Sequence, residues 1–321
     1  MSQKGSGIGE PDLSQLIKIA RQYYLESLSL REIAAKRNIS TATVSRLLSR
    51  AKREGLVEIT IHDLEPNFRD LEIGIESRFA MKECSVIRFS DNSASVYRDM
   101  AEAVGRILRR LLKSGTYLGV SWGETLRAIG QYLRVPGLKH VRVVPIIGAM
   151  GTIETGIYAN SIARSFADRL GGVSYLVNPP AILDSRQVRN SVSKDRNFFE
   201  VKSLWNQIDV ALLSVSGLDT DASIARFGIF SKDELEYLRS LGIVCTTNFN
   251  MIDAYGRPVA NKLSERIINM DLQQLKKAKN VVLAVTGVAK VEATLAALRG
   301  RIADVLIVDD RTAALVLQNS N

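Results

Sequence analysis

The N-terminal part of the chain carries three short segments in which apolar residues recur at helical spacing. In the first segment the apolar positions predict one helix face, made of Leu13, Leu16, Ile17, Ala20, Tyr23 and Tyr24. Ser29 stands three positions before Glu32, the spacing of a capping box, and predicts the start of a second helix. Ser40 suits the N-cap of a third helix, and the polar turn before it is short. The three segments together predict a helix-turn-helix unit.

The predicted third helix has two different faces. Val44, Leu47, Leu48 and Ala51 share the apolar face, whereas the opposite face is small, polar and cationic. Small hydroxyl residues let a helix approach base edges, and arginines reach guanine or phosphate oxygens. We therefore predict a DNA recognition helix, with contacts from Arg31, Lys36, Ser40, Thr41, Thr43, Ser45, Arg46 and Arg50.

Two further segments connect this unit to the rest of the chain. Gly55 predicts the end of the third helix, and the alternating segment 56–61 predicts a strand, as in a winged helix-turn-helix. After Pro66 we expect a linker helix with one apolar stripe, formed by Phe68, Leu71, Ile75 and Phe79. The stripe can pack on the larger domain or on its copy in a second subunit, and the sequence leaves both possibilities open.

Beyond residue 82, short runs rich in β-branched residues alternate with helical stretches. This rhythm predicts an α/β fold with a doubly wound, mainly parallel sheet. Helical stretches include the apolar series from Val96 to Leu111 and the later pair Leu295 and Leu298. The expected strands are Cys84–Phe89, Tyr117–Val120, Val141–Ile147, Val173–Val177, Ile208–Val215, Ile243–Thr246, Val281–Val285 and Asp304–Val308.

Ligands of such sheets bind beyond the carboxyl ends of the strands, so we looked for polar residues there. The loop 119–126 offers glycines together with the hydroxyl groups of Ser121 and Thr125, and the loop 148–152 is also rich in glycine. Neither loop has the spacing of a Walker A motif or of a dinucleotide fingerprint, so we expect no nucleotide cofactor. Other strand ends contribute Gly217, Asp253, Lys290, Asp309 and Asp310, a lysine and carboxylates that suit a hydroxyl-rich anion.

Composition narrows the class of protein. A net charge of +9 with a pI near 9.6 fits a polyanionic partner such as DNA. The two histidines, His62 and His140, are too few for a His-rich metal centre, and we assign no catalytic residue and no metal ligand. The two cysteines form no disulfide framework, and no apolar run is long enough for a bilayer. We expect a cytoplasmic protein without a membrane partner.

The order of these features resembles the SorC family of sugar-responsive bacterial regulators. The resemblance rests on Ile39–Ser40, Thr43–Leu48, Gly119–Gly123, Lys290–Ala293, Ala296–Gly300 and Asp309–Ala313. It implies a winged helix-turn-helix fused to an effector domain of the ribose-5-phosphate isomerase and glucosamine-6-phosphate deaminase type, in homodimers or homotetramers. The implied effector is a phosphorylated sugar, with Ser121–Thr125 and Gly148–Gly151 at the phosphate and with Asp253 and Lys290 nearer the hydroxyl groups.

Two departures from the family pattern bear on the effector. Glu124 places a carboxylate in the phosphate loop, which opposes a phosphate unless the carboxylate is paired or points away, and Thr286-Gly287 stands where the family commonly has two glycines. A free sugar or polyol is therefore an alternative effector. The residues expected to bind the effector are Ser121, Trp122, Gly123, Glu124, Thr125, Gly148, Met150, Gly151, Gly217, Asp253 and Lys290.

These predictions combine into a four-part chain. Residues 1–11 form a flexible tail, 12–63 the DNA-binding domain, 64–81 the linker helix and 82–321 the effector and oligomerisation domain. We predict a transcriptional regulator of carbohydrate metabolism that is not an enzyme and whose partners are operator DNA and a sugar-like effector. The alternatives are a sugar-phosphate isomerase or deaminase with a DNA-binding appendage, and a regulator whose large domain serves only for oligomerisation.

Overall fold

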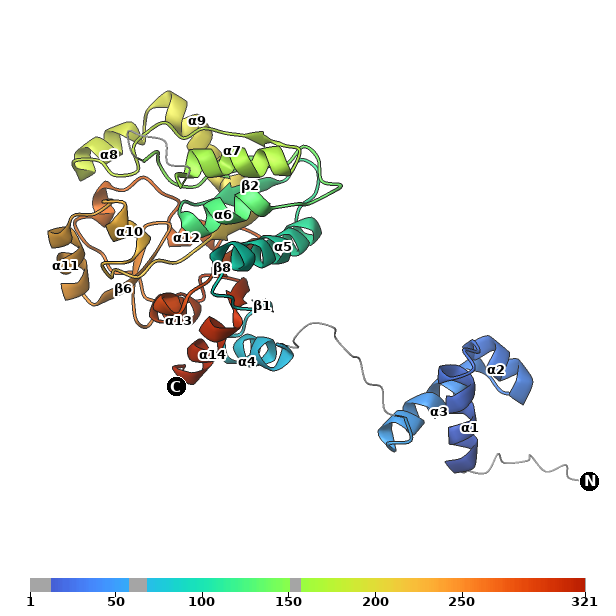
Figure 1. Ribbon diagram of the computed structural model, residues 1–321. Coiled ribbons are helices and arrows are strands. Elements are labelled where there is room, and N and C mark those ends of the chain that lie inside the picture. Colours follow the sequence, from blue (N-terminus) through green and yellow to red (C-terminus); the bar gives the residue numbers. More distant parts are fainter. Residues whose placement is uncertain (1–12, 58–67, 151–156, 321) are drawn as a thin grey trace, which may run out of the picture. The chain divides into compact units, whose positions relative to one another are not determined.

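The computed structural model describes residues 13–57, 68–150 and 157–320. The chain divides into two compact units, Met1–Glu65 and Pro66–Asn321. Figure 1 shows the helices of the first unit in blue and the sheet and helices of the second in the colours that follow. In the parts of the chain that the structure describes, no helix is both long and apolar enough to span a bilayer.

The N-terminal unit contains the three predicted helices, α1 (Leu13–Tyr24), α2 (Leu30–Arg37) and α3 (Thr41–Arg53). The Ser29 side chain caps α2 through the expected capping box, and the Ser40 side chain caps α3. Val44, Leu48 and Ala51 are buried in the small core, as the two-face pattern of α3 predicts. The segment 56–61 predicted as a strand lies outside the described residues except for Leu56 and Val57, which pack against this core without strand structure.

The predicted apolar face of α1 is partly wrong. Leu16 and Ala20 are buried, but Leu13, Ile17 and Tyr23 are 55%, 43% and 37% exposed, and Ile19 takes their place in the core. The helix is rotated so that the face carrying Leu16, Ile19 and Ala20 meets α2 and α3. The spacing of apolar residues fits both this face and the predicted one, so it could not show which of them packs against the core.

The larger unit is built on a seven-stranded parallel sheet in the order β1-β9-β8-β5-β2-β3-β4. This confirms the predicted parallel α/β fold. Seven of the eight predicted strands lie in this sheet, with bounds that differ by a few residues at most ends. The strands are β1 (Glu83–Ile87), β2 (Tyr117–Val120), β3 (Arg142–Pro145), β4 (Val173–Ser174), β5 (Val210–Leu213), β8 (Asn280–Val285) and β9 (Val305–Asp309).

The eighth predicted strand does not join the parallel sheet. β6 (Ile243–Thr247) instead pairs antiparallel with β7 (Asn250–Asp253) in a separate two-stranded sheet. The tight turn between them places Asn248 and Phe249 at φ values of 50° and 58°. Because neither residue is glycine, the usual sequence signal for such a turn is missing here.

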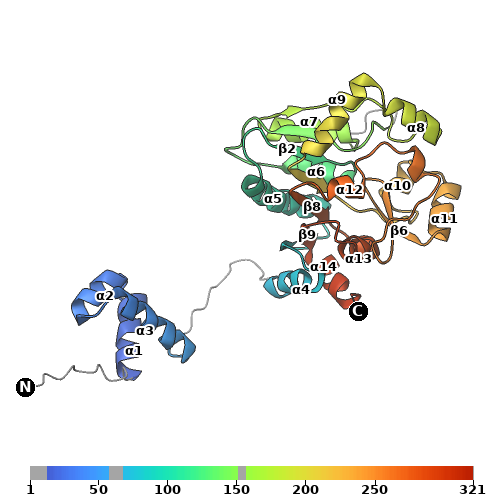
Figure 2. The same ribbon diagram turned by 180° about the vertical axis from the view of Figure 1, so that it is seen from behind.

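Helices cover both faces of the parallel sheet, so the sheet is doubly wound. One face is covered by α5 (Ser93–Leu111), α6 (Glu124–Tyr132) and α7 (Ala159–Arg169), which lie side by side in Figure 1. The other face, toward the viewer in Figure 2, packs against α4 (Arg69–Phe79), α9 (Arg196–Leu204), α12 (Leu272–Leu275), α13 (Val291–Arg299) and α14 (Asp310–Gln318).

A third apolar cluster joins the β6–β7 pair to further short helices. It includes the rings of Trp122, Phe230 and Phe249. Around it and at the rim of the second face lie α8 (Arg186–Val192), α10 (Ser223–Arg226), α11 (Lys232–Ser240) and the 3-10 turns η1 (Trp205–Gln207), η2 (Ser264–Arg266) and η3 (Val288–Lys290).

The predicted linker helix is α4, and its apolar stripe packs within the chain. Ile75 is fully buried, with Phe68, Leu71 and Phe79 packed against the same core. Glu76 Oε1 accepts a hydrogen bond of 2.8 Å from the Cys84 amide, and Glu72 Oε1 accepts one of 3.0 Å from the Val86 amide. Helix α4 thus covers the edge strand β1, so the stripe is occupied by its own domain.

Candidate functional site

A small polar cavity lies at the carboxyl ends of β2 and β5, where the sheet rule predicts a ligand. Its free volume is about 30 Å³, and it is partly open to solvent. Six predicted effector residues line it, namely Ser121, Trp122, Gly123, Glu124, Thr125 and Lys290. The other lining residues are Ser214, Val215, Ser216, Ser223, Thr246 and Asn248.

The loop from β2 to α6 forms one wall of this cavity. Ser121 Oγ donates a hydrogen bond of 2.8 Å to Asn248 Oδ1, and Trp122 packs edge-on against Phe249 at 5.1 Å between ring centroids. Gly123 stands at the N-cap of α6 with φ of 115°, a conformation that other residues rarely adopt. Because α6 has no side-chain cap, its first backbone N–H groups are available to an anion.

Lys290 brings a cation to the same wall. Its Nζ donates a hydrogen bond of 3.1 Å to Thr125 Oγ1. Burial lowers the pKa of Lys290 to about 8, while the carboxylates of Glu124 and Asp309 act in the opposite direction. An ammonium group with so little solvation is suited to an anionic or hydroxyl-bearing ligand.

The carboxylate of Glu124 is paired. Its oxygens accept hydrogen bonds from Arg226 Nη1 at 3.1 Å and Arg226 Nη2 at 3.4 Å, and Ser223 Oγ donates a third at 3.2 Å. Arg226 neutralises the charge that would otherwise oppose a phosphate in this loop. The pair also links α6 to α10 at the edge of the cavity.

Two hydroxyl groups in this cavity have no partner. Ser214 Oγ and Thr246 Oγ1 are buried and make no hydrogen bond with any of the described residues. A buried hydroxyl without a partner costs free energy, and such groups in native proteins call for an explanation. Both residues line the cavity, and the two oxygen atoms themselves are buried behind its surface.

Sequence reasoning missed Ser214, Ser216, Ser223, Thr246 and Asn248. The polar Ser214 and Ser216 directly follow β5, so the strand-end rule could have found them. Thr246 lay inside a strand assigned to the wrong sheet. Asn248 comes from the antiparallel turn, and its Nδ2 donates to the carbonyl groups of Ile146 and Met270 at 3.0 and 3.1 Å.

The remaining predicted effector residues do not line this cavity. Asp253 ends β7 and accepts hydrogen bonds from the Tyr255 amide and from Arg257, so it shapes a turn. Gly148 lies so close to Ala181 that a Cβ would stand 2.5 Å from backbone atoms there. Met150 and Gly217 are also absent from the lining, and Gly151 lies outside the described residues.

The two aspartates at the end of β9 have structural partners. Asp309 is fully buried and caps α14 through the Thr312 amide at 2.9 Å, and it accepts the Gly287 amide at 2.9 Å. Asp310 accepts the Phe89 amide at 2.6 Å. Asp309 therefore fixes the loop that precedes Lys290. In the described ranges, no cluster of three or more His, Cys, Asp or Glu side chains is arranged to hold a metal ion.

The candidate DNA-binding face lies on α3 in the N-terminal unit. Thr41, Ser45 and Arg46 are exposed, as are Arg31 and Lys36 on α2. The hydroxyl groups of Ser40 and Thr43 lie 2.8 Å apart, and Ser40 Oγ accepts the Thr43 amide. Arg46 Nη2 donates to Thr43 Oγ1 at 3.4 Å, and Arg50 Nε forms an ion pair with Glu54 at 2.6 Å. Arg46 is thus a solvent-accessible arginine near the middle of the polar face.

Comparison with known proteins defines the class. The family model described as "Putative sugar-binding domain" matches residues 66–318. The deoxyribonucleoside regulator of Bacillus subtilis is 30% identical, over 94% of this chain and 97% of the relative. The sorbitol operon regulator of Klebsiella pneumoniae is also 30% identical, over 96% of this chain and 98% of the relative.

Solved structures agree with these relatives. The full-length sorbitol operon regulator SorC of Klebsiella pneumoniae aligns with a TM-score of 0.73 at 28% identity, over 95% of this chain and 98% of that one. A DeoR family transcriptional regulator from Listeria monocytogenes aligns with a TM-score of 0.69 at 25% identity, over 77% of this chain and 98% of that one.

The protein is therefore a transcriptional regulator with a sugar-binding domain. It belongs to the sugar-binding domain family of SorC-type regulators, as the sequence resemblance predicted. Since these relatives are regulators rather than enzymes, the alternative of a sugar-phosphate isomerase or deaminase is set aside.

Proposed function

We propose that the protein binds operator DNA through α3 and that a sugar-type ligand in the cavity beside Lys290 changes its affinity for the operator. The relatives named above are regulators of a sorbitol operon and of deoxyribonucleoside metabolism, which supports a small carbohydrate as the effector. The DNA contacts come from Ser40, Thr41, Thr43, Ser45, Arg46 and Arg50 of the α3 region, with Arg31 and Lys36 of α2 beside them.

The observation that carries this proposal is the pair of unpartnered hydroxyl groups, Ser214 Oγ and Thr246 Oγ1, in the cavity that Lys290 also lines. A polyhydroxylated ligand supplies the missing hydrogen bonds. A phosphate on that ligand would lie at the uncapped start of α6 near Lys290, where Arg226 already neutralises Glu124. We therefore favour a phosphorylated sugar over a neutral polyol.

The contact of Arg226 with Glu124 at the edge of the cavity offers a way for the ligand to act on the domain. Because the free volume is only about 30 Å³, we propose that a bound sugar shifts lining residues, Glu124 among them. A ligand that opens this contact favours one conformation of the effector domain over another. An effector can change operator binding only if it binds one conformation of the protein more tightly than another.

Under this proposal each segment of the chain has its own role. Residues 12–63 bind DNA after the tail 1–11, residues 64–81 contain α4, and residues 82–321 bind the effector and hold subunits together. We propose a cytoplasmic homodimer or homotetramer, because two-fold operators need two correctly spaced recognition helices. Since the stripe on α4 is buried within its own chain, the subunit contact has to use other surfaces.

Thermal melting tests the effector proposal. A panel of sugar phosphates, free sugars and polyols is added to the full-length protein at equal concentration, and the ligand that binds the folded state most tightly raises the melting temperature most. A sugar phosphate should give the largest increase, and the increase should be lost in a Thr246→Val variant. Equal stabilisation of wild type and variant by every ligand would place the effector elsewhere.

A further inference from the structure

A second cavity of about 600 Å³ lies beside the first, and the two are separated by the β6–β7 turn. Asn248 lines the first cavity, whereas the next residues, Phe249 and Asn250, line the second. The second cavity also meets α9, η1, η2 and α12. Its volume falls within the usual range for small-molecule sites.

The floor of the second cavity is aromatic. Phe198 and Trp205 lie edge-on at 5.9 Å between ring centroids, and both side chains are almost fully buried. Trp205 Nε1 donates to the Pro145 carbonyl at 2.9 Å, so the indole has its polar partner. The exposed parts of the two rings are small, and they offer a ligand an apolar edge at the cavity wall.

Two cations, Lys202 and Arg189, line this cavity. Lys202 is half-buried, and its ammonium group has no hydrogen bond or ion pair with any described residue, although it lies 6.0 Å from the centre of the Phe198 ring. Arg189 Nε donates to the Glu265 carbonyl at 3.1 Å. Burial and the charge of Arg189 lower the pKa of Lys202, whereas Asp271 acts against this shift.

Asp271 also lines the cavity and brings one negative charge. Its Oδ1 accepts the Gln274 amide at 2.8 Å, and it caps α12 through a capping box, so the carboxylate is held at the helix start. Lys202 and Arg189 against Asp271 leave the lining with an excess of positive charge.

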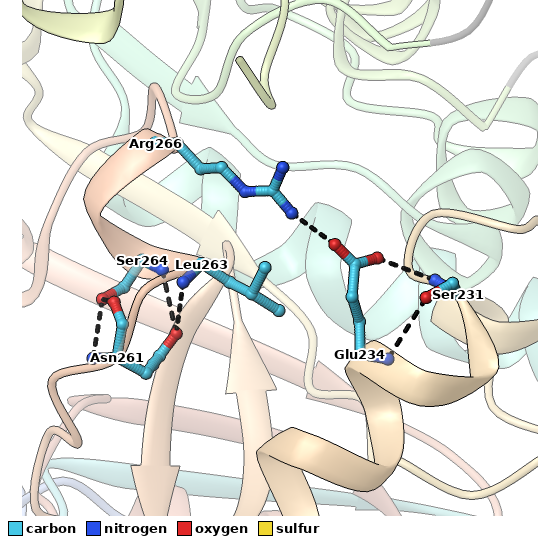
Figure 3. Close-up of polar contacts among 6 residues, drawn as sticks. All are labelled: Ser231, Glu234, Asn261, Leu263, Ser264 and Arg266. Atoms are coloured by element: carbon cyan, nitrogen blue, oxygen red, sulfur yellow. Dashed lines mark hydrogen bonds and ion pairs between the residues drawn. The ribbon is translucent and has the colours of Figure 1, made fainter. Parts of the chain in front are cut away.

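The rim of the cavity is held in place by a hydrogen-bond network, shown in Figure 3. Asn261 Oδ1 accepts the amides of Leu263 and Ser264 at 3.0 and 2.9 Å, and Ser264 Oγ donates to the Asn261 carbonyl at 2.7 Å. Arg266 pairs with Glu234, the residue that closes the capping box of α11. Ser264 lines the cavity, so this wall is ordered before any ligand arrives.

We propose that the second cavity binds a small organic oxyanion that carries a flat apolar group, at a site distinct from the effector site. The oxyanion lies between Lys202 and Arg189, and the apolar group lies on Phe198 and Trp205. This inference goes beyond the proposed effector function because the two cavities share no lining residue.

Each cavity contains one of the two tryptophans of the chain, so binding can be measured at each separately. In full-length Trp122→Phe protein, Trp205 is the sole tryptophan. Phenyl phosphate is titrated while Trp205 fluorescence is followed, with benzyl alcohol as the neutral counterpart and inorganic phosphate as the anion without a ring. Phenyl phosphate should give a saturable change at lower concentration than either of them.

Substitutions of Lys202 test whether this lysine binds the oxyanion. In the same background, Lys202→Gln should weaken phenyl phosphate binding by about tenfold or more, the loss expected for one charge-assisted hydrogen bond. Lys202→Arg should keep most of the affinity, and Lys113→Gln, an exposed lysine elsewhere, should keep all of it. Circular dichroism confirms that each variant is folded.

Three results would overturn the proposal. The first is the absence of a saturable Trp205 signal, and the second is equal affinity in the Lys202→Gln and Lys113→Gln proteins. The third is stronger binding of benzyl alcohol than of phenyl phosphate, which would contradict an oxyanion site. A Lys290→Met variant should leave the Trp205 signal unchanged, so this test is independent of the effector proposal.

Discussion

The ammonium group of Lys290 donates a hydrogen bond of 3.1 Å to Oγ1 of Thr125, and this contact joins the start of α13 to the first turn of α6. The two residues are far apart in the sequence, yet the parallel sheet brings the ends of β2 and β8 to the same edge. The cation thus stands beside a helix start that lacks a side-chain cap. This juxtaposition underlies the proposed effector site and several of the predictions that follow.

Replacing Lys290 by Met should remove a pH-dependent part of the stability. In the folded protein the pKa of Lys290 is about 8, below the ordinary value of 10.5 expected in the unfolded chain. Between these two values the unfolded chain binds more protons at this residue, so the free energy of unfolding rises with pH there. Urea titrations should show wild type gaining stability relative to Lys290→Met from pH 8 to 10.5, and a constant difference below pH 8. If the difference in the free energy of unfolding stayed constant across the whole pH range, folding would not lower the pKa of Lys290.

Thr246→Val should separate ligand binding from stability. Thr246 Oγ1 is buried without a partner, so its removal should leave the free energy of unfolding unchanged or raise it by up to about 1 kcal/mol. Effector affinity should fall about fivefold, since a ligand hydroxyl loses its partner. Calorimetry and urea unfolding measure the two quantities.

Thr247→Val is the matched control for this variant. The hydroxyl of Thr247 donates to the Ser214 carbonyl at 3.0 Å, so its loss should cost about 1 kcal/mol of stability. If Thr246→Val destabilised the protein as much as Thr247→Val and kept full effector affinity, the hydroxyl of Thr246 would have a structural role instead.

Arg226→Ala should weaken binding of a phosphorylated effector. Without Arg226 the Glu124 carboxylate keeps its charge unpaired in the loop that we assign to the phosphate. The Arg226 side chain is 52% exposed and that of Glu124 30%, so the ion pair contributes little to stability and the variant should melt within a few degrees of wild type. Affinity for a sugar phosphate, measured by calorimetry, should fall about tenfold, while affinity for a neutral polyol should change little.

The double variant Arg226→Ala/Glu124→Gln tests the reason for this effect. Removing the carboxylate should restore most of the lost affinity for the sugar phosphate, because the repulsion is gone. No recovery would mean that Arg226 contacts the ligand directly rather than through Glu124.

Arg46→Ala should weaken specific operator binding by about 1 to 3 kcal/mol if Arg46 reads a guanine. Arg46 is exposed on α3, and among the described residues its side chain makes one long hydrogen bond, to Thr43 Oγ1, so the fold should not be affected. Lys18→Ala, an exposed residue on α1, is the control. Fluorescence anisotropy with operator and with scrambled DNA measures the effect, and wild-type affinity in Arg46→Ala would remove this residue from the interface.

The elements of this fold that sequence patterns predict best are those with strong local signals. The central strands β8 and β9 are buried runs rich in β-branched residues, and the capping box at Ser29 and Glu32 marks α2. The strand at Ile243–Thr246 also has this composition, but the tight turn at Asn248 and Phe249 folds it back on β7. Composition identifies a strand, whereas its partner depends on a turn that lacks the usual glycine.

The part of the candidate site that one strand-end loop forms could be predicted from the sequence. The loop 121–125 and Lys290 meet as expected, because parallel strands end at one edge. The partners that complete the site, Arg226, Thr246 and Asn248, come from segments outside the parallel sheet, where no strand-end rule applies. Asp253, also expected at the effector, accepts hydrogen bonds within its own turn and is absent from the lining of this cavity, so its role toward the effector stays a prediction.

The most direct test measures operator affinity while the effector is titrated. Fluorescently labelled operator DNA is bound by wild-type protein and by Lys290→Met, and the sugar phosphate with the largest melting shift is added to each. In wild type the effector should change the operator dissociation constant by about five- to 150-fold, the usual span of allosteric coupling. In Lys290→Met the operator should bind as in the unliganded wild type, and the effector should have little influence at the same concentration. An identical effector response in the two proteins, or an effector that binds wild type without altering its operator affinity, would contradict the proposed control of DNA binding from this cavity.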